Sequence, residues 1–395
     1  MNSMLTAVEQ KLNPFPLYST MRQTQPVYHD PQRGNWNVFR YDDVQRVLSE
    51  YTTFSSQFVR KRTLSLLPRE PFAAAIISTD PPRHRQLRSL VTQAFTPRAV
   101  EALAPRITQI VQEHLDTVQP SGCMDVIHDL GYPLPVIVIA ELLGVPSQDR
   151  ARFKRWSDNA VQAANFGTNV DFKKFMSPEM MEMGKYFMGI IEKRRKAPGD
   201  DLISGLLDAS VDGKHLSQIE LLGFCVLLLV AGNETTTNLI GNAMLSLAEQ
   251  PESWQELRAR PELLPQAIEE ALRYRSPVQA MFRIAAREVK LYDQTIPANA
   301  PVVAWIGSAN HDESVFPEAE TFDIERTANK HIAFGYGIHF CLGAPLARLE
   351  ARIALGAMLE RFQSFRLDSQ VTLERQPSLV VYGLHSLPIE FSLAG

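Results

Sequence analysis

The sequence contains little cysteine and little excess charge, and no apolar run is long enough to cross a bilayer. Only three cysteines occur in 395 residues, too few for a disulfide framework. The formal net charge of -4 gives no basic excess of the kind that marks nucleic-acid-binding chains. The longest apolar run, 221–232, is shorter than the roughly 20 residues that span a bilayer. The first residues, MNSMLTAVEQKLNPF, lack a secretory signal, so we expect a cytoplasmic protein with no membrane anchor and no nucleic-acid partner.

The chain also lacks the features that separate domains. No Gly/Ser-rich or Pro-rich spacer, internal repeat or low-complexity tract interrupts it. Length alone would suggest two or three domains, but no linker supports that division. The composition, 45% hydrophobic and 21% charged, is typical of a globular protein with a deep core. We therefore expect a single domain over residues 1–395, and a monomer.

Hydrophobic periodicity predicts a mainly α protein with a few small β-sheets. Strand patterns occur at 26–41, which reads as a hairpin around DPQRGN, and again at 283–306 and 370–393. Amphipathic patterns typical of helices cover 82–94, 97–117, 134–144, 147–164, 178–196, 218–249, 252–259, 263–275 and 345–361.

A lone cysteine stands in the stretch FGYGIHFCLGAP, residues 334–345, among Gly335, Gly337 and Gly343. Most lone cysteines are small buried hydrophobes, but three glycines suggest that another group approaches the main chain. A helix that begins at Pro345 would favour the thiolate of Cys341. A single cysteine lacks partners for structural zinc or an iron–sulfur cluster. Haem, which needs one proximal protein ligand, fits best.

Three further patterns carry polar groups whose meaning the residues alone leave open. In AGNETTT, 231–237, an acid and three hydroxyls interrupt an apolar helix, which is either a polar face at a domain contact or a chemical site. The glycine of this motif, Gly232, leaves one side of the helix bare, so another group could lie against it.

In EEALR, Glu270 and Arg273 are three residues apart and can pair, although such pairs are usually solvated. In DPPRHRQLR, His84 and Arg88 share a helix face that could bind a carboxylate, or could simply face solvent. Arg283 and His339 are further candidates for anion binding.

Taken together, these motifs resemble the cytochrome P-450 haem-thiolate monooxygenases. The segment from Phe334 to Gly343 is similar to the family's signature Phe-Gly-x-Gly-x-His-x-Cys-x-Gly at every fixed position. AGNETT resembles the oxygen-activation motif, and EALR the Glu-x-x-Arg motif. The resemblance runs through nearly the whole chain and includes no departure at a fixed position.

The resemblance implies a fold and a cofactor. It implies the single-domain, triangular fold of the family, with haem b buried between a long central helix and the helix after the cysteine loop, and Cys341 as the iron ligand. The remaining implied residues fall into three groups: the acid and alcohol of oxygen activation, a structural triad, and the contacts of the haem and its propionates. They are, in that order, Glu234 and Thr235; Glu270, Arg273 and Arg326; and His84, Arg88, Arg283, His339, Phe334 and Gly343. The alternative for Thr235 is a bond to the carbonyl four residues earlier.

The resemblance further implies an enzyme that activates dioxygen and hydroxylates a medium-sized, mainly apolar substrate of the fatty acid, terpenoid or steroid class. Electrons would come from a ferredoxin or flavodoxin with an NAD(P)H-dependent reductase, docked near Arg83, Arg85, Arg98, Arg348 and Arg352. The alternatives are a tailoring oxidase of polyketide or macrolide intermediates, a peroxide-driven peroxygenase and a non-catalytic haem sensor. The family's substrate-facing segments would place these side chains near substrate: Phe72, Ile76, Phe166, Leu227, Val230, Ala231, Val278, Met281 and Val380.

Overall fold

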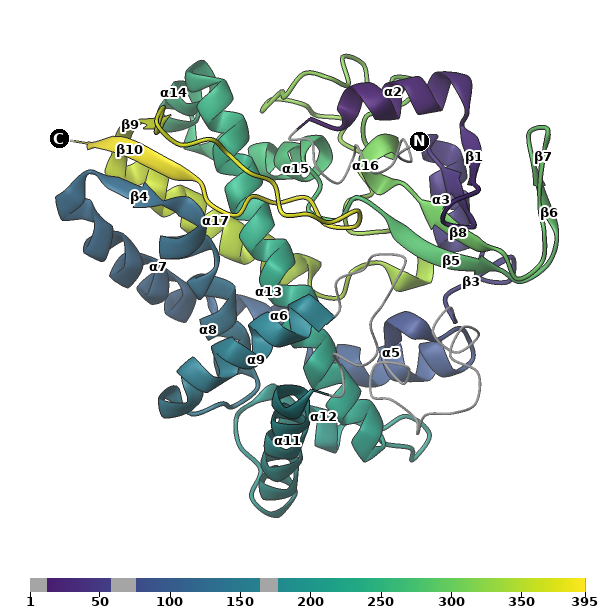
Figure 1. Ribbon diagram of the computed structural model, residues 1–395. Coiled ribbons are helices and arrows are strands. Elements are labelled where there is room, and N and C mark those ends of the chain that lie inside the picture. The colour runs from purple at the N-terminus through teal and green to yellow at the C-terminus, as the bar shows by residue number, and fades with distance from the viewer. Residues whose placement is uncertain (1–12, 58–75, 164–176, 395) are drawn as a thin grey trace. The chain divides into compact units, whose positions relative to one another are not determined.

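The structure, a computed structural model, describes residues 13–57, 76–163 and 177–394 (Figure 1). Contacts group these residues into two compact units, each made of several chain segments. Unit 1 takes 13–54, 104–134 and 235–394, and unit 2 takes 55–57, 76–103, 135–163 and 177–234. Helix α13 (Gln218–Glu249) belongs to both, because the boundary falls between Glu234 and Thr235.

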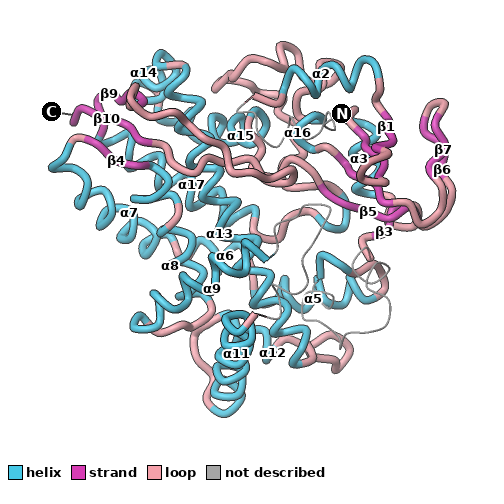
Figure 2. Tube along the Cα trace, in the orientation of Figure 1, coloured by secondary structure: helices cyan, strands magenta, loops and turns pink. Residues whose placement is uncertain are grey.

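Unit 1 contains the sheets, as Figure 2 shows. A five-stranded sheet has the order β1-β2-β8-β5-β3, in which β2 and β8 run parallel. A three-stranded sheet has the order β4-β10-β9, and β6 pairs with β7 as a hairpin. The strands are β1 Val27–Asp30, β2 Asn35–Val38, β3 Phe54–Ser55, β4 Cys123–Asp125, β5 Met281–Ala285, β6 Val289–Leu291, β7 Gln294–Ile296, β8 Pro301–Ala304, β9 Phe362–Leu367 and β10 Pro388–Leu393.

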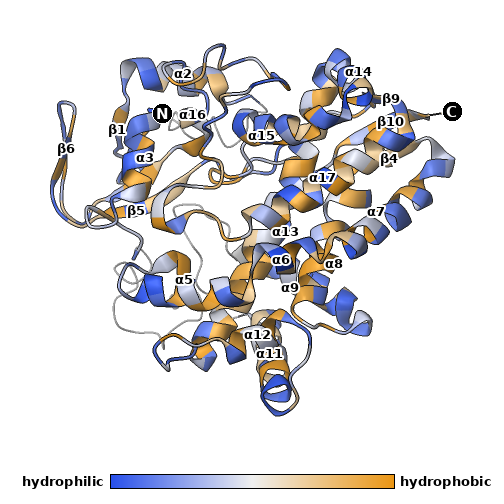
Figure 3. Ribbon diagram, turned by 180° about the vertical axis from the view of Figure 1, so that it is seen from behind, coloured by the Kyte–Doolittle hydropathy of each residue, from blue (hydrophilic) through white to orange (hydrophobic). Residues whose placement is uncertain are grey.

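Helices pack around these sheets and form the rest of unit 1. One apolar core lies where α3 covers the five-stranded sheet, and it includes Val44, Val47, Val302 and Phe316. Helix α7 places Ile107, Ile110 and Leu115 in the interior and packs along α17, while its polar face appears as blue bands in Figure 3. The helices are α2 Phe15–Thr24, α3 Tyr41–Ser49, α7 Ala104–Val118, α14 Pro251–Ala259, α15 Leu264–Tyr274, α16 Ile306–Ala309 and α17 Ala344–Arg361, with a π-helical turn at Val126–Gly131 and 3-10 turns at Gln119–Ser121, Pro261–Leu263 and Gly337–His339.

Unit 2 is helical in its described part. Its longest helix starts at a capping box: the Glu220 carboxylate accepts from the Ser217 amide, and the Ser217 hydroxyl accepts from the Glu220 amide. The helices of this unit are α5 Arg83–Ala94, α6 Pro97–Glu101, α8 Pro133–Leu142, which starts two residues before the boundary, α9 Arg150–Ala163, α11 Pro178–Lys196, α12 Leu202–Asp208 and the first half of α13, with 3-10 turns at Ile76–Ser78 and Ser147–Asp149.

The predicted mainly α fold with small sheets is confirmed, and the helix limits at 178–196 and 218–249 agree with α11 and α13. The single helix predicted over 97–117 is wrong. The chain forms α6 and α7 instead, because Pro105 has no N–H to donate to the carbonyl of Glu101.

The strand pattern predicted over 370–393 is also largely wrong, since only β10 is a strand there. The buried apolar residues before it form a loop whose main chain bonds to a neighbouring segment, with Tyr382 N–H donating to Pro277 O and Gln279 N–H donating to Val380 O. The apolar pattern therefore indicated that these residues are buried, but it did not indicate a continuous β-strand. The partners of β10 are β4 and β9, neither of which the periodicity had indicated.

Helix α13 meets, by length and composition alone, the criteria for a membrane span, and it is the one helix that does so among the described residues. In the window concerned, 61% of the residues are buried inside the protein. The core helix of a globular protein passes the same criteria, and this burial is what such a helix shows.

Candidate functional site

The cysteine loop lies in unit 1 between a buried pair, Ile332 and Ala333, and helix α17. Its main chain folds back on itself, because the Cys341 N–H donates to the Phe334 carbonyl at 2.9 Å and the Gly335 N–H donates to the Ile332 carbonyl at 2.8 Å. The Cys341 side chain is half-buried. The predicted ligand is thus held by its neighbours and still accessible.

The three glycines of the loop differ in backbone conformation and in what lies beside them. Gly335 and Gly337 adopt φ of 76° and 75°, a region that disfavours other residues. A Cβ on Gly337 would lie 2.9 Å from Ser49 Cα, so α3 occupies that side. A Cβ on Gly343 would meet only the Cys341 sulfur, at 3.9 Å. Protein packing therefore explains Gly337, whereas the side of Gly343 is open for another group.

A single-ligand cofactor fits these residues. No three His, Cys, Asp or Glu side chains of the described chain come together as metal ligands. What the loop offers is one accessible thiol at the N-terminal end of an 18-residue helix, which favours the thiolate. An open glycine beside that thiol leaves room for a flat group. Haem with one proximal thiolate matches this donor set.

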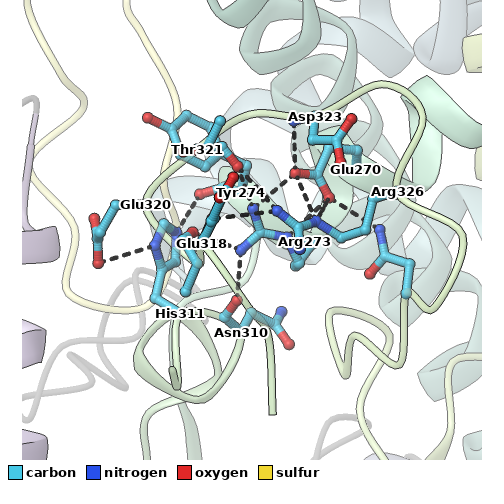
Figure 4. A network of polar contacts seen from close by, with 12 residues as sticks. Glu270, Arg273, Tyr274, Asn310, His311, Glu318, Glu320, Thr321, Asp323 and Arg326 are labelled. Atoms are coloured by element: carbon cyan, nitrogen blue, oxygen red, sulfur yellow. Dashed lines mark hydrogen bonds and ion pairs between the residues drawn. The ribbon is translucent and has the colours of Figure 1, made fainter. Parts of the chain in front are cut away.

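A buried ion-pair network surrounds Glu270 of α15 (Figure 4). Both Glu270 and Arg273 have fully buried side chains, and their carboxylate and guanidinium form two bonds of 2.7 and 2.8 Å. Arg326 donates to the same carboxylate at 3.1 Å. Arg273 also donates to the carbonyls of Asn310, Ala319 and Thr321. The three predicted members therefore meet, and the alternative of a solvated surface pair does not hold.

The hydroxyls of AGNETTT point to different neighbours. The Thr237 hydroxyl donates to the Gly131 carbonyl at 2.9 Å, and Thr236 hydrogen-bonds the carboxyl group of Glu350 on α17. Both threonines are buried, whereas Thr235 is half-buried. A Cβ on Gly232 would lie 2.6 Å from Ile139 Cδ1, so the bare side of the helix is filled by α8. Thr236 and Thr237 thus each have a partner on another segment of unit 1.

Two carboxyl groups have pKa values near neutrality. Burial raises the pKa of Glu234 to about 7. Burial also raises the pKa of Glu350 to about 8, against the opposing effect of the Thr236 hydrogen bond. A group with a pKa near the working pH can both give and take a proton. The sequence analysis had selected Glu234 and missed Glu350. The sequence does signal Glu350, because it is an acid at a position where helix periodicity predicts a buried side chain.

The predicted anion-binding residues are described within their own units. In unit 2, His84 is 2% exposed, and burial followed by the charge of Arg88 lowers its pKa to about 4, so the imidazole is neutral at pH 7. In unit 1, Arg283 lies on β5, is 3% exposed and donates to the Phe282 carbonyl at 2.8 Å. His339 ends the short 3-10 turn before Cys341.

The predicted substrate-facing residues are only partly covered by the structure. Phe72 and Phe166 lie outside the described residues. Ala231 is exposed in the middle of α13, next to Val230, which is 3% exposed. Val278 and Met281 pack against the core that includes the five-stranded sheet. Val380 is buried, and its carbonyl accepts the Gln279 N–H. Ile76 and Leu227 are half-buried.

Two of the arginines proposed for donor docking already have carboxylate partners. Arg83 pairs with Glu220 at 2.5 Å, and Arg348 pairs with Glu269 at 2.7 Å. Arg85, Arg98 and Arg352 are exposed. The charge available to an acidic partner is therefore smaller than the sequence indicated.

Comparison with known proteins gives matches over nearly the whole chain. The family model described as cytochrome P-450 matches residues 21–393. Cytochrome P-450 109 of Bacillus spizizenii is 42% identical over 392 residues, 98% of this chain and 94% of that protein. The structure of CYP109E1 from Bacillus megaterium in complex with testosterone matches with a TM-score of 0.86 and 44% identity, over 96% of this chain and 99% of that one. A post-tailoring hydroxylase involved in himastatin biosynthesis, HmtN, matches with a TM-score of 0.85 and 39% identity, over 98% and 99% of the two chains.

Proposed function

Because the chain belongs to the cytochrome P-450 family of haem-dependent monooxygenases, we propose that Cys341 is the one protein ligand of the haem iron in a soluble, cytoplasmic enzyme. The observation that carries this proposal is the setting of the thiol. It is half-buried, its amide is bonded to the Phe334 carbonyl, and the open side of Gly343 lies beside it at the start of α17. A ligand held in this way keeps its orientation while remaining accessible.

When bound, haem supplies the activation of dioxygen, for which electrons come from a redox partner. The residues that would hold its propionates are His84, Arg88, Arg283 and His339. A neutral His84 can donate one hydrogen bond to a carboxylate, and a nearby anion would raise its pKa above the present value of about 4. Arg283 brings a buried positive charge, which a propionate would neutralise.

The proton-handling residues we propose are Glu234 and Thr235. Burial raises the pKa of Glu234 to about 7, so near neutral pH the carboxyl group can both give and take a proton. The adjacent Thr235 hydroxyl can hold a water molecule and pass that proton onward. Their neighbours Thr236 and Thr237 are occupied by Glu350 and Gly131.

For the substrate, we propose a medium-sized, mainly apolar molecule of the steroid, terpenoid or fatty acid class. The exposed Ala231 and the apolar side chains of Leu227 and Val230 on the same helix support this class. The relative CYP109E1, which is crystallised with testosterone, supports it further. A tailoring role on a polyketide or peptide intermediate is the second candidate, favoured by the likeness to the himastatin hydroxylase.

For the electron donor, we propose a ferredoxin or flavodoxin served by an NAD(P)H-dependent reductase. An acidic partner would be steered by arginines, and steering of this kind weakens as salt rises. Since Arg83 and Arg348 are already paired, Arg85 and Arg98 are the charges whose reversal should slow reduction most in unit 2.

The reduced carbon monoxide spectrum tests the haem-thiolate assignment. The wild-type protein should give the strongly red-shifted band of a thiolate-ligated haem, and Cys341→Ala should lose that band and all monooxygenation. Cys123→Ala is the matched control, because Cys123 is exposed and should retain both. Retention of the band in Cys341→Ala would show that another residue holds the iron.

A further inference from the structure

We propose that Glu269 is a positioning residue for the cysteine loop: its carboxylate joins helix α15 both to the segment before Cys341 and to the helix after it. The inference rests on the proposed function only in assigning the iron ligand, and the contacts themselves stand on geometry. Glu269 directly precedes Glu270, the acid of the buried network, and is the first residue of the stretch EEALR, in which the sequence analysis gave it no role.

The Glu269 carboxylate has partners on two other chain segments. Arg348 of α17 binds it with a two-pronged fork, Nε to Oε1 and Nη2 to Oε2, both at 2.7 Å. His331, two residues before the buried Ala333, lies 3.0 Å from Oε2 through its Nε2. The His331 Nδ1 accepts from the Ala333 N–H at 3.2 Å, so its ring proton sits on Nε2 and is donated to Glu269.

The same contacts reach the peptide that carries the cysteine. The Arg348 guanidinium lies 4.5 Å from the centre of the Phe334 ring, and the ring of His331 lies 6.2 Å from it. The Phe334 carbonyl in turn accepts the Cys341 N–H at 2.9 Å. Glu269 thus fixes the two side chains that flank Phe334, and Phe334 fixes the amide of the cysteine.

Glu269 and Glu270 bind different segments of the chain around the cysteine loop. Glu270 binds Arg326, the Asp323 amide and the Asn329 side chain, which precede the loop. Glu269 binds His331, just before the loop, and Arg348, on the helix after it. Burial raises the pKa of Glu269, but the hydrogen bonds from Arg348 and His331 outweigh it and lower the pKa to about 2. The carboxylate is therefore charged whenever the protein is folded at neutral pH.

The contribution of this cluster to global stability should be small, while its local effect should be large. The side chains of Glu269 and Arg348 are 31% and 38% exposed, and solvent weakens pairs of this kind. A bidentate fork nevertheless fixes direction better than a single contact does. Loss of the carboxylate should loosen the loop without unfolding the protein.

Hydrogen exchange of the full chain provides the test. Glu269→Ala should speed exchange of the Gly335 and Cys341 amides about tenfold, since each lost charged hydrogen bond is worth roughly that factor. Glu269→Gln, which keeps the shape but loses the charge, should give a smaller increase. Glu262→Gln is the matched control, because Glu262 lies just before α15 with a side chain 71% exposed. Equal exchange of these two amides in Glu269→Ala and wild type would overturn the proposal.

The haem-loaded protein provides a second readout that a merely structural role would not move. If Glu269 positions the ligand, the red-shifted carbon monoxide band of Glu269→Ala should decay faster than that of wild type, while amides in the five-stranded sheet exchange at unchanged rates. An unchanged decay would count against the inference and leave the proposed function standing. Absence of the band in the wild-type protein would instead refute the proposed ligand, and the exchange of the loop amides would still decide the role of Glu269.

Discussion

The acids of α15 and the acids of α13 and α17 place the same carboxyl group in different surroundings. Glu269 and Glu270 meet arginines at 2.7 Å, whereas Glu234 is governed by burial alone and Glu350 by burial opposed only by a threonine hydroxyl. Ion pairs with arginine hold the carboxylates of Glu269 and Glu270 in place, so that these acids fix the chain, and hydrogen bonds from Arg348 and His331 lower the pKa of Glu269. Burial without a neighbouring cation raises the pKa values of Glu234 and Glu350 toward neutral pH, so that these two acids can exchange protons.

The largest effect is expected from breaking the α15 network. Glu270→Ala leaves the Arg273 guanidinium buried without its carboxylate, which should cost about 3 to 5 kcal/mol of unfolding free energy. Urea unfolding monitored by circular dichroism measures this cost. Glu262→Ala, at an exposed acid just before α15, should change stability by less than about 0.5 kcal/mol. A similar small change for Glu270→Ala would mean that the network is dispensable.

The next largest effect concerns Glu350 and pH. Its folded pKa of about 8 exceeds its ordinary value of 4.5, so the stability that it contributes is complete below pH 4.5 and is lost as pH rises toward 8. The unfolding free energy should therefore carry a downward slope of up to about 1.4 kcal/mol per pH unit from this one group. Glu350→Gln should remove that component. Parallel stability–pH curves for wild type and variant, measured between pH 5 and 8, would contradict the raised pKa.

A smaller effect is expected at Glu234, where a proton carrier is lost while the shape is kept. Glu234→Gln should slow product formation by about tenfold, since water can replace the carboxyl group in part. The limb of the wild-type pH–rate profile with an apparent pKa near 7 should disappear from the variant. Haem content and the carbon monoxide band serve as controls and should not change. Persistence of that limb in the variant would assign it to another group.

The smallest effects on stability are expected from substitutions of Thr237 and Thr235, two hydroxyl residues of α13 with different proposed roles. Thr237→Val should cost about 1 kcal/mol of stability for the lost bond to Gly131 and leave product per NADPH unchanged. Thr235→Val should instead give less product per NADPH and more hydrogen peroxide, because the side chain no longer holds the water that relays the proton. Measured coupling and unfolding in the two variants decide between the roles. Wild-type coupling in Thr235→Val would indicate that this hydroxyl only bonds to its own helix.

Much of the fold followed from local pattern, because helix periodicity and caps are read within a few residues. The ends of α11 and α13 agree with the prediction since Pro178 and the Ser217 capping box mark their starts. The errors arose where buried apolar residues do not belong to a helix or a strand. The apolar residues of 379–382 are buried in a loop, and a pattern of burial alone cannot identify the partner of a main-chain hydrogen bond.

The sequence by itself determined the cysteine loop, the acid–alcohol motif and the Glu270–Arg273 spacing, because motifs of this kind are set by residue type and separation along the chain. Only the tertiary structure decided which glycines are filled by protein, since Ile139 and Ser49 approach Gly232 and Gly337 from distant segments. It also decided that Glu269 meets Arg348 across 79 residues and that Glu350 faces Thr236. Charge and pKa depend on what lies within a few ångströms in space, and distance along the chain does not report that.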